Sequence, residues 1–300
     1  MSDSDRFCDL PSGIRLCYRE DGPAHAPAMV LIAGLALDLT MWPPAMVSDL
    51  VAAGFRVIRF DNRDAGRSTH MATKPPAVWR QATGRLRPED YTLEDMVQDT
   101  IGLLNALGID RVDLVGMSMG GMIGQIIAAG YPERIRSFTS IFSTTGARGV
   151  GYQSKAMLLS MASPRSKTAE ASARTHLRAL VRWGNPAFGF DPEIEEAWAL
   201  NTWERGGGLA AGAGGARQVA AIQKSKDRTE LVRTITAPTL VIHGDYDPMI
   251  HPSGGKATAD AIPGARLVTI PNLRHNIIAS VAPKLTPLII EHAKAAALRS

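Results

Sequence analysis

Short apolar runs alternate with helix-like segments along the first half of this chain. The runs at Met29–Ala33, Phe55–Asp61 and Arg111–Val115 have the length and composition of buried strands. Before the third run, Thr92 followed by Asp95 resembles the capping box that opens a helix. Strands that alternate with helices predict a mostly parallel sheet, with right-handed crossovers and helices on both faces.

The N-terminal segment has a different pattern, which predicts a hairpin. Phe7–Leu10 and Ile14–Arg19 lie on either side of the turn residues Pro11-Ser12-Gly13. The chain has two cysteines, Cys8 and Cys17, and they flank this turn. A disulfide across the hairpin is one interpretation, but two reduced and packed thiols are the interpretation that we favour.

The alternation stops at Ser143 and returns with the strand pattern of Thr239–Asp247. The interval has helical patterns and no clear strand. We therefore predict an α/β fold in which a mostly parallel central sheet is flanked by helices, with a helical cap inserted after the sixth strand. The predicted core is residues 1–142 and 234–300, and the predicted cap is residues 143–233.

One motif carries specific chemistry. Gly116-Met117-Ser118-Met119-Gly120 stands directly between a predicted strand and a predicted helix. A serine on such a turn has a strained backbone and projects its hydroxyl above the sheet, and its glycine neighbours lack the Cβ atoms that would block the turn. We expect Gly121 and Gly124 to let the helix pack closely on the strands. The plain alternative is a glycine-rich junction with an incidental serine. The context favours Ser118 as a nucleophile.

A serine hydroxyl becomes nucleophilic when a base takes its proton and an acid orients that base. On a sheet of this kind the acid and the histidine follow the serine in chain order, each in a loop after a later strand. His275 meets both requirements. Asp247 is the predicted acid and Asp245 is its alternative, and we expect the other aspartate to cap the loop. The remaining histidines precede the serine, lie in the insert, a strand or a helix, or follow the acid too closely: His25, His70, His176, His243, His251 and His292.

Acyl transfer also needs hydrogen-bond donors for the tetrahedral oxyanion. The predicted donors are the backbone N–H of Met119, directly after the nucleophile, and the backbone N–H of Leu35, in the loop after Ala33-Gly34. Asp61 and Arg63 end a strand near the same edge of the sheet. We interpret them as structural residues that hold their loop through ion pairs or hydrogen bonds.

Four segments carry a family resemblance: LIAGLALDLTMW, FRVIRFDNRDAGRST, LLNALGIDRVDLVGMSMGGMIGQ and SFTSIFSTTG. Over essentially its whole length the chain resembles the α/β-hydrolases, and among them the subgroup that contains aclacinomycin methylesterase and many bacterial carboxylesterases. The resemblance implies Ser118 as nucleophile, His275 as base and Asp247 as acid. It also implies Leu35 and Met119 as oxyanion donors.

Two positions depart from the pattern of that subgroup. Many relatives have His-Gly before the first oxyanion residue, where this chain has Ala33-Gly34. Because the donor is a backbone group, we expect the oxyanion hole to be retained. Relatives often have a small residue before the catalytic histidine, where this chain has Arg274. This second departure concerns the shape and charge of the pocket wall.

The predicted function is hydrolysis of small to medium apolar or aromatic carboxylic esters through an acyl-enzyme on Ser118. The same three residues could also open lactones, carry out perhydrolysis or hydrolyse a carbon–carbon bond. Haloalkane dehalogenation is disfavoured, because that chemistry places an aspartate where Ser118 stands. A small-molecule receptor on a hydrolase scaffold is the alternative without catalysis.

We expect substrate choice to reside in the insert. Its apolar side chains are predicted to form its own small core, and some of them to line the pocket: Met157, Leu158, Leu159, Met161, Leu177, Trp183, Phe188, Phe190, Trp198 and Trp203. The stretch Gly206–Gly215 has few side chains to pack, so we expect it to be mobile and to act as a hinge or entry loop. Recognition of an N-terminal amine would need acidic residues, and a solvated helix face explains the candidates equally well: Glu170, Asp191, Glu193, Glu195 and Glu196.

The composition is that of an ordinary globular enzyme. Of the residues 45% are apolar and 21% are charged, and the net charge of +4 comes from scattered basic residues. This pattern gives no reason to expect a nucleic acid or a membrane as partner. The N-terminus lacks a basic start and an apolar stretch, so the expected location is cytoplasmic. The expected partner is a small-molecule ester, and no cofactor or metal is predicted. The sequence does not determine the oligomeric state.

Overall fold

An eight-stranded sheet forms the centre of the molecule, with strand order β1-β2-β4-β3-β5-β6-β7-β8. The structure is a computed structural model that describes residues 4–154, 157, 166–208 and 211–298. β1 pairs antiparallel with β2 and β2 pairs antiparallel with β4, whereas all other neighbours are parallel. The strands are β1 (Arg6–Asp9), β2 (Arg15–Asp21), β3 (Ala28–Ile32), β4 (Arg56–Phe60), β5 (Val112–Met117), β6 (Ile135–Ile141), β7 (Thr239–Gly244) and β8 (Arg266–Ile270).

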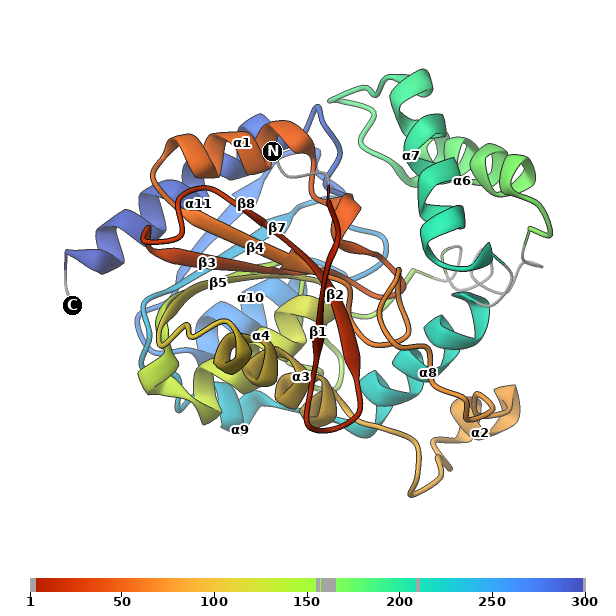
Figure 1. The fold of residues 1–300 in the computed structure, drawn as a ribbon, viewed down its shortest axis with the longest axis horizontal. Coiled ribbons are helices and arrows are strands. Elements are labelled where there is room, and N and C mark those ends of the chain that lie inside the picture. Colours follow the sequence, from red (N-terminus) through yellow and green to blue (C-terminus); the bar gives the residue numbers. More distant parts are fainter. Residues whose placement is uncertain (1–3, 155–156, 158–165, 209–210, 299–300) are drawn as a thin grey trace.

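Helices cover both faces of the sheet (Figure 1). The described α-helices are α1 (Pro44–Ala52), α2 (Val78–Thr83), α3 (Leu93–Ala106), α4 (Met119–Gly130), α6 (Ala169–Trp183), α7 (Pro192–Arg205), α8 (Ala211–Lys224), α9 (Thr229–Val232), α10 (Ser253–Ala261) and α11 (Ala282–Ala297), and the short 3₁₀ turns are η1 (Leu39–Met41) and η2 (Pro132–Arg134). One hydrophobic core includes α3 and α4, and a second includes α1 and α11. The strands between them are therefore buried on both faces, which explains their continuous apolar sequences.

The chain between β6 and β7, called the insert below, carries α6, α7, α8 and α9. The predicted helical insertion after the sixth strand is thus confirmed. In Figure 1, α6 and α7 stand together at the upper right, beyond the ends of the strands, and α8 lies below them. Both ends of the insert contact Gln125 of α4, because its Oε1 accepts from the Arg228 guanidinium and its Nε2 donates to the carbonyl of Thr144. The Arg228 guanidinium also donates to Thr144, which joins the two ends. The predicted cap boundaries, 143–233, stay a prediction.

Local signals place most elements where the sequence predicts them. Thr92 and Asp95 form a capping box at the start of α3, with reciprocal side-chain to backbone hydrogen bonds. The stretch from Asn62 to Asp90, which contains three prolines and no strong periodic pattern, holds the short helix α2. Gly84 ends this helix in the left-handed conformation with φ of 67°. Among the described residues no helix is long and apolar enough to span a bilayer.

The glycine-rich stretch differs from its prediction. The expectation of a mobile segment over Gly206–Gly215 is wrong for its second half, because α8 already begins at Ala211. A Cβ added at Gly214 would lie 2.2 Å from the carbonyl oxygen of Asp64. Because glycine has no Cβ, α8 can lie directly against the core loop that contains Asp64. The small residues of this stretch therefore allow packing here. Residues 209–210 lie outside the described part.

Candidate active site

Ser118 occupies a sharp turn between β5 and α4. Its φ of 55° and ψ of −115° are strained for a residue with a side chain. A Cβ added at Gly116 would lie 2.2 Å from the carbonyl oxygen of Gly120, and one added at Gly120 would lie 2.1 Å from that of Ile32. The Ser118 N–H donates to the carbonyl of Ile141 at 2.8 Å. The two glycines therefore allow this turn, and the predicted strand-to-helix context is confirmed.

The structure brings the three predicted side chains together. His275 Nε2 lies 3.0 Å from Ser118 Oγ, and His275 Nδ1 lies 2.6 Å from Asp247 Oδ2. Asp247 follows β7 and His275 follows β8, so all three residues stand at the carboxyl edge of the sheet. With Nδ1–H donating to the carboxylate, Nε2 is the acceptor for the serine hydroxyl. The geometry is that of a serine with a hydrogen-bonded base.

Asp247 is held as an ionised carboxylate. Its Oδ1 accepts hydrogen bonds from the backbone N–H groups of Met249 and Ile250, at 2.8 and 2.9 Å. Burial opposes ionisation, but the imidazoles of His275 and His243 outweigh burial and hold the pKa of Asp247 below its usual range. An acceptor that stays charged keeps the His275 ring oriented.

The alternatives that sequence reasoning weighed have other partners. Asp245 Oδ1 accepts from the backbone N–H of Asn272 at 2.6 Å, as expected for an aspartate that caps its loop. His243 is buried within β7, and its Nε2 lies 2.9 Å from the carbonyl of Ile250. His251 stacks on Tyr152 at 4.4 Å between ring centroids. These contacts agree with structural roles for all three.

The predicted oxyanion donors lie beside the serine. Met119 is the first residue of α4, where a backbone N–H has no acceptor within the helix. A Cβ added at Gly34 would lie 3.4 Å from Ser118 Cβ, which places the loop carrying Leu35 directly against the nucleophile turn. Gln218 from α8 accepts the N–H of Ala36 at 2.7 Å. The insert therefore holds this loop from outside. Because the loop (residues 33–41) carries the predicted donor Leu35, it is called the oxyanion loop below.

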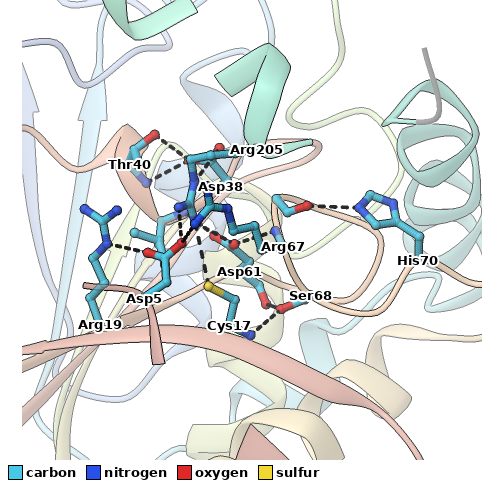
Figure 2. A network of polar contacts seen from close by, with 12 residues as sticks. Asp5, Cys17, Arg19, Asp38, Thr40, Asp61, Arg67, Ser68, His70 and Arg205 are labelled. Carbon is cyan, nitrogen blue, oxygen red and sulfur yellow. Dashed lines mark hydrogen bonds and ion pairs between the residues drawn. The ribbon is translucent and has the colours of Figure 1, made fainter. Parts of the chain in front are cut away.

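A buried ionic cluster holds the far part of the oxyanion loop (Figure 2). Arg205, the last residue of α7, has its Nη2 2.8 Å from Asp61 Oδ2 and its Nε 3.4 Å from Asp38 Oδ2. Its Nη1 donates to Asp5. Asp61 Oδ1 in turn accepts the N–H of Leu39 at 2.7 Å. These four residues, Arg205, Asp5, Asp38 and Asp61, are called the Arg205 cluster below. The cluster joins the insert to the loops after β3 and β4, which agrees with the structural role predicted for Asp61.

Charges within the Arg205 cluster shift one another's titration. Burial and the neighbouring Asp38 raise the pKa of Asp61 to about 6. Burial lowers the pKa of Arg205, but Asp61 and Asp38 outweigh it and raise this pKa above its usual value. Burial, Asp61 and Asp5 raise the pKa of Cys17 to about 12. Cys17 is therefore a protonated thiol, and the hairpin register pairs it with Phe7, while Cys8 pairs with Leu16.

The predicted anchor Arg63 lies outside this cluster. It forms a bidentate pair with Asp99 of α3, at 2.6 and 2.7 Å. Its backbone carbonyl accepts from Gln218 Nε2 at 2.8 Å. Arg63 thus joins the loop after β4 to a core helix and to the insert, which agrees with its predicted structural role.

On the other side of the serine, the insert contacts the loop of His275 through neutral groups. Asn185, between α6 and α7, accepts the backbone N–H of Arg274 with its Oδ1 and donates to Asn276 with its Nδ2. The Arg274 side chain donates to the carbonyl of Arg182 at 3.0 Å. Asn185 therefore holds both neighbours of His275. It carries no sequence signal, because nothing local relates it to residues beyond position 270.

A cavity of about 230 Å³ opens beside His275, between the core and the insert. Its walls come from the loops after β3 and β8, from Met117, and from α6 and α7: Leu37, Thr40, Met41, Pro43, Pro44, Met117, His176, Leu180, Ile194, Glu195, Trp198, His275, Asn276, Ile277, Ile278 and Ala279. Among the apolar insert residues proposed from sequence, Trp198 is in this wall. Phe188 and Phe190 pack against the core that includes α1 and α11. Leu158, Leu159 and Met161 lie outside the described residues.

The described residues include no group of three or more histidine, cysteine, aspartate or glutamate side chains placed to hold a metal ion. The groups that the structure gathers at this site are a serine hydroxyl, an imidazole, a carboxylate and backbone N–H donors. These groups suit nucleophilic attack on a carbonyl carbon and stabilisation of the resulting oxyanion.

The strand order, the strained serine turn and the insert after β6 define the class of α/β-hydrolase folds. A family model described as alpha/beta hydrolase fold matches residues 27–280, so the chain belongs to the α/β-hydrolase family. It is similar to the rhodomycin D methylesterase DauP of Streptomyces sp. (strain C5), with 31% identity over 293 residues that cover 91% of this chain and 93% of that protein.

Two further relatives are enol-lactonases. The chain is 28% identical to 3-oxoadipate enol-lactonase 2 of Acinetobacter baylyi, over 83% of this chain and 82% of that protein. The crystal structure of the enol-lactonase from Burkholderia xenovorans LB400 aligns with a TM-score of 0.74 and 26% identity, covering 96% of this chain and 100% of that one. These three relatives are thus named as one methylesterase and two enol-lactonases.

Proposed function

We propose that this protein is a serine carboxylic-ester hydrolase, with Ser118 as nucleophile, His275 as base and Asp247 as the acid that orients it. The observation that carries the proposal is the continuous hydrogen-bonded series from Ser118 Oγ through His275 to Asp247, at 3.0 and 2.6 Å. The methylesterase and lactonase names of its relatives support the same reaction class.

The reaction follows from the direction of each hydrogen bond. As Ser118 Oγ attacks the acyl carbon, its proton moves to His275 Nε2, and the ionised Asp247 stabilises the imidazolium. His275 then gives this proton to the leaving alcohol. Water, activated by the same imidazole, attacks the acyl-enzyme and releases the acid.

The tetrahedral intermediate requires donors at its oxyanion. The backbone N–H groups of Leu35 and Met119 are the proposed pair, and each is worth about 3 kcal/mol of barrier in comparable sites. The tight contact between Gly34 and the serine turn supports this assignment. Since both donors are backbone groups, Ala33 in place of a histidine leaves the proposed hole intact.

The proposed substrates are small to medium esters with an apolar or aromatic body. A cavity of about 230 Å³ with mainly apolar walls supports this size class, because a cavity of about 150 Å³ already holds a benzene ring. Lactone opening is the second candidate, and the similarity to two enol-lactonases supports it.

The test is the variant Ser118→Ala. We expect a folded protein whose ester hydrolysis falls by about three orders of magnitude or more, because the oxyanion hole and binding alone remain. The measurement is turnover of a chromogenic acetate ester, together with covalent labelling of the wild type by a fluorophosphonate. The neighbours of Ser118 are needed for its turn, so the matched control is Ser48→Ala at an exposed position of α1. Turnover by Ser118→Ala at the wild-type rate refutes the proposal.

A further inference from the structure

A histidine and a glutamate from two helices of the insert meet at the wall of the cavity beside His275. His176 Nε2 of α6 lies 2.8 Å from Glu195 Oε2 of α7. The His176 ring also packs on Trp198, with 4.9 Å between ring centroids. All three side chains line the cavity that His275 lines from the core. The pair therefore faces the same space as the proposed catalytic base.

This position is unfavourable for a carboxylate unless the charge has partners. Glu195 is 7% exposed, and its neighbours in the wall include Leu180, Ile194 and Ile278. A carboxylate can accept about four hydrogen bonds. Among the described residues, His176 is the hydrogen-bond partner of Glu195. Neither oxygen of Glu195 is among the fully buried polar atoms without a partner in the described residues, so Oε1 remains accessible and able to accept a further hydrogen bond.

We propose that the His176–Glu195 pair binds a hydroxyl group of the substrate, so that the enzyme selects apolar esters that carry a hydroxyl at a distance from the ester. This inference rests on the proposed ester hydrolysis and names its substrate class. The ester is held at Ser118 and His275, the apolar body fills the cavity, and the hydroxyl reaches the pair.

The chemistry of the pair singles out a hydroxyl. A hydroxyl donates to a lone pair of Glu195 that the His176 N–H leaves unused, and it brings no charge into the cavity. A substrate carboxylate would be repelled by Glu195. An ammonium group could also donate to Glu195, but moving its charge from water into this mainly apolar cavity costs more free energy than moving a hydroxyl. A ketone accepts only and leaves Glu195 unsatisfied.

The experiment compares methyl phenylacetate with its meta- and para-hydroxy derivatives. For the wild type we expect kcat/KM for the better hydroxylated ester to exceed that for the plain ester by about 10- to 100-fold, the usual range for a hydrogen bond to a charged group. In the double variant His176→Phe/Glu195→Leu this ratio should fall to about one. Glu193→Leu, on the exposed side of α7, is the matched control and should keep the wild-type ratio.

The ratio separates specificity from general damage. If the double variant loses activity on all the esters equally, its ratio stays that of the wild type and the proposal is wrong. A wild type without a preference also overturns it, as does a preference for the para-aminomethyl ester over the hydroxylated ones. Should the double variant fail to fold, Glu195→Gln keeps the shape of the side chain, and we expect it to lower the ratio about tenfold.

Binding to Ser118→Ala distinguishes this inference from the proposed function. Calorimetry with the plain and hydroxylated methyl esters needs no turnover. Tighter binding of the hydroxylated ester, lost in the background Ser118→Ala/Glu195→Gln, supports the inference even if the wild type hydrolyses neither ester. Equal binding of both esters overturns the inference and leaves ester hydrolysis to be judged by turnover and by fluorophosphonate labelling.

Discussion

The insert contacts the two sides of the proposed active site in different ways. Near the oxyanion loop it contributes buried charge, because Arg205 meets Asp5, Asp38 and Asp61. Near His275 it contributes the neutral amide of Asn185 and most of one wall of a mainly apolar cavity, in which the His176–Glu195 pair stands. Removing one partner of a buried ion pair leaves the other charge buried without compensation, whereas water can replace a neutral amide as a hydrogen-bond partner. The oxyanion side should therefore be the fixed attachment, and the histidine side the one that can yield to a substrate.

The largest expected effect is on the fixed side. Arg205→Met removes the charge that compensates three buried carboxylates, so we expect the free energy of unfolding to fall by about 3–5 kcal/mol. Urea denaturation at neutral pH measures it. The control is Arg178→Met on the exposed face of α6, which should change stability by less than about 0.5 kcal/mol. Equal effects from both variants would remove the contrast between the two sides.

A pH series sharpens the same contrast at Asp61. Its pKa is about 6 in the folded protein, against about 4 in an unfolded chain. At a pH between these two pKa values, Asp61 is mostly protonated in the folded protein and mostly ionised in the unfolded chain. Lowering the pH from 7 to 4 should therefore stabilise the wild type relative to Asp61→Asn, by at most about 3 kcal/mol.

Unfolding free energies of the two proteins at several pH values check this sign. The difference between the two unfolding free energies at each pH cancels the contributions of the titratable groups that both proteins share. One such group is Asp247, whose lowered pKa makes stability fall as the pH falls. Asp49→Asn, at an exposed position of α1, is the control and should differ from the wild type by a constant amount. A difference that is constant or reversed for Asp61→Asn contradicts burial as the dominant cause.

The smallest expected effect on stability is on the histidine side. Asn185→Ala removes the contacts with Arg274 and Asn276, so we expect a loss of about 1–2 kcal/mol of stability. Because these residues flank His275, kcat should fall about tenfold while KM changes less. Asn201→Ala on the exposed face of α7 is the control. A change in stability alone, with kcat retained, would show that Asn185 does not position His275.

The proposed catalytic residues were predictable because their signals are local. Ser118 stands in a motif between a strand and a helix, and Asp247 and His275 each follow a strand in the expected chain order. The choice of Asp247 over Asp245 matches the hydrogen bonds in the structure. Chemistry that a turn or a strand end imposes can be recognised without knowing the rest of the fold.

The attachments of the insert were not predictable, because their partners are distant in sequence. Asn185 contacts a loop 91 residues away, and Arg205 contacts Asp61 at a separation of 144 residues. Neither follows a periodic pattern. The prediction of a mobile segment failed at Gly214, because a glycine in the sequence is equally compatible with a loose loop and with a close helix contact.

The Arg205 cluster also has a consequence for the order of events during synthesis. Asp5 and Arg205 are 200 residues apart, and Ala36 and its acceptor Gln218 are 182 apart. The ribosome must therefore add most of the chain before the N-terminal hairpin and the oxyanion loop receive these partners. Contacts that close such long segments form late and slow folding. Until then the nascent chain carries the serine turn without the outer supports of its oxyanion loop, and it also lacks Asp247 and His275, which follow the insert in the sequence.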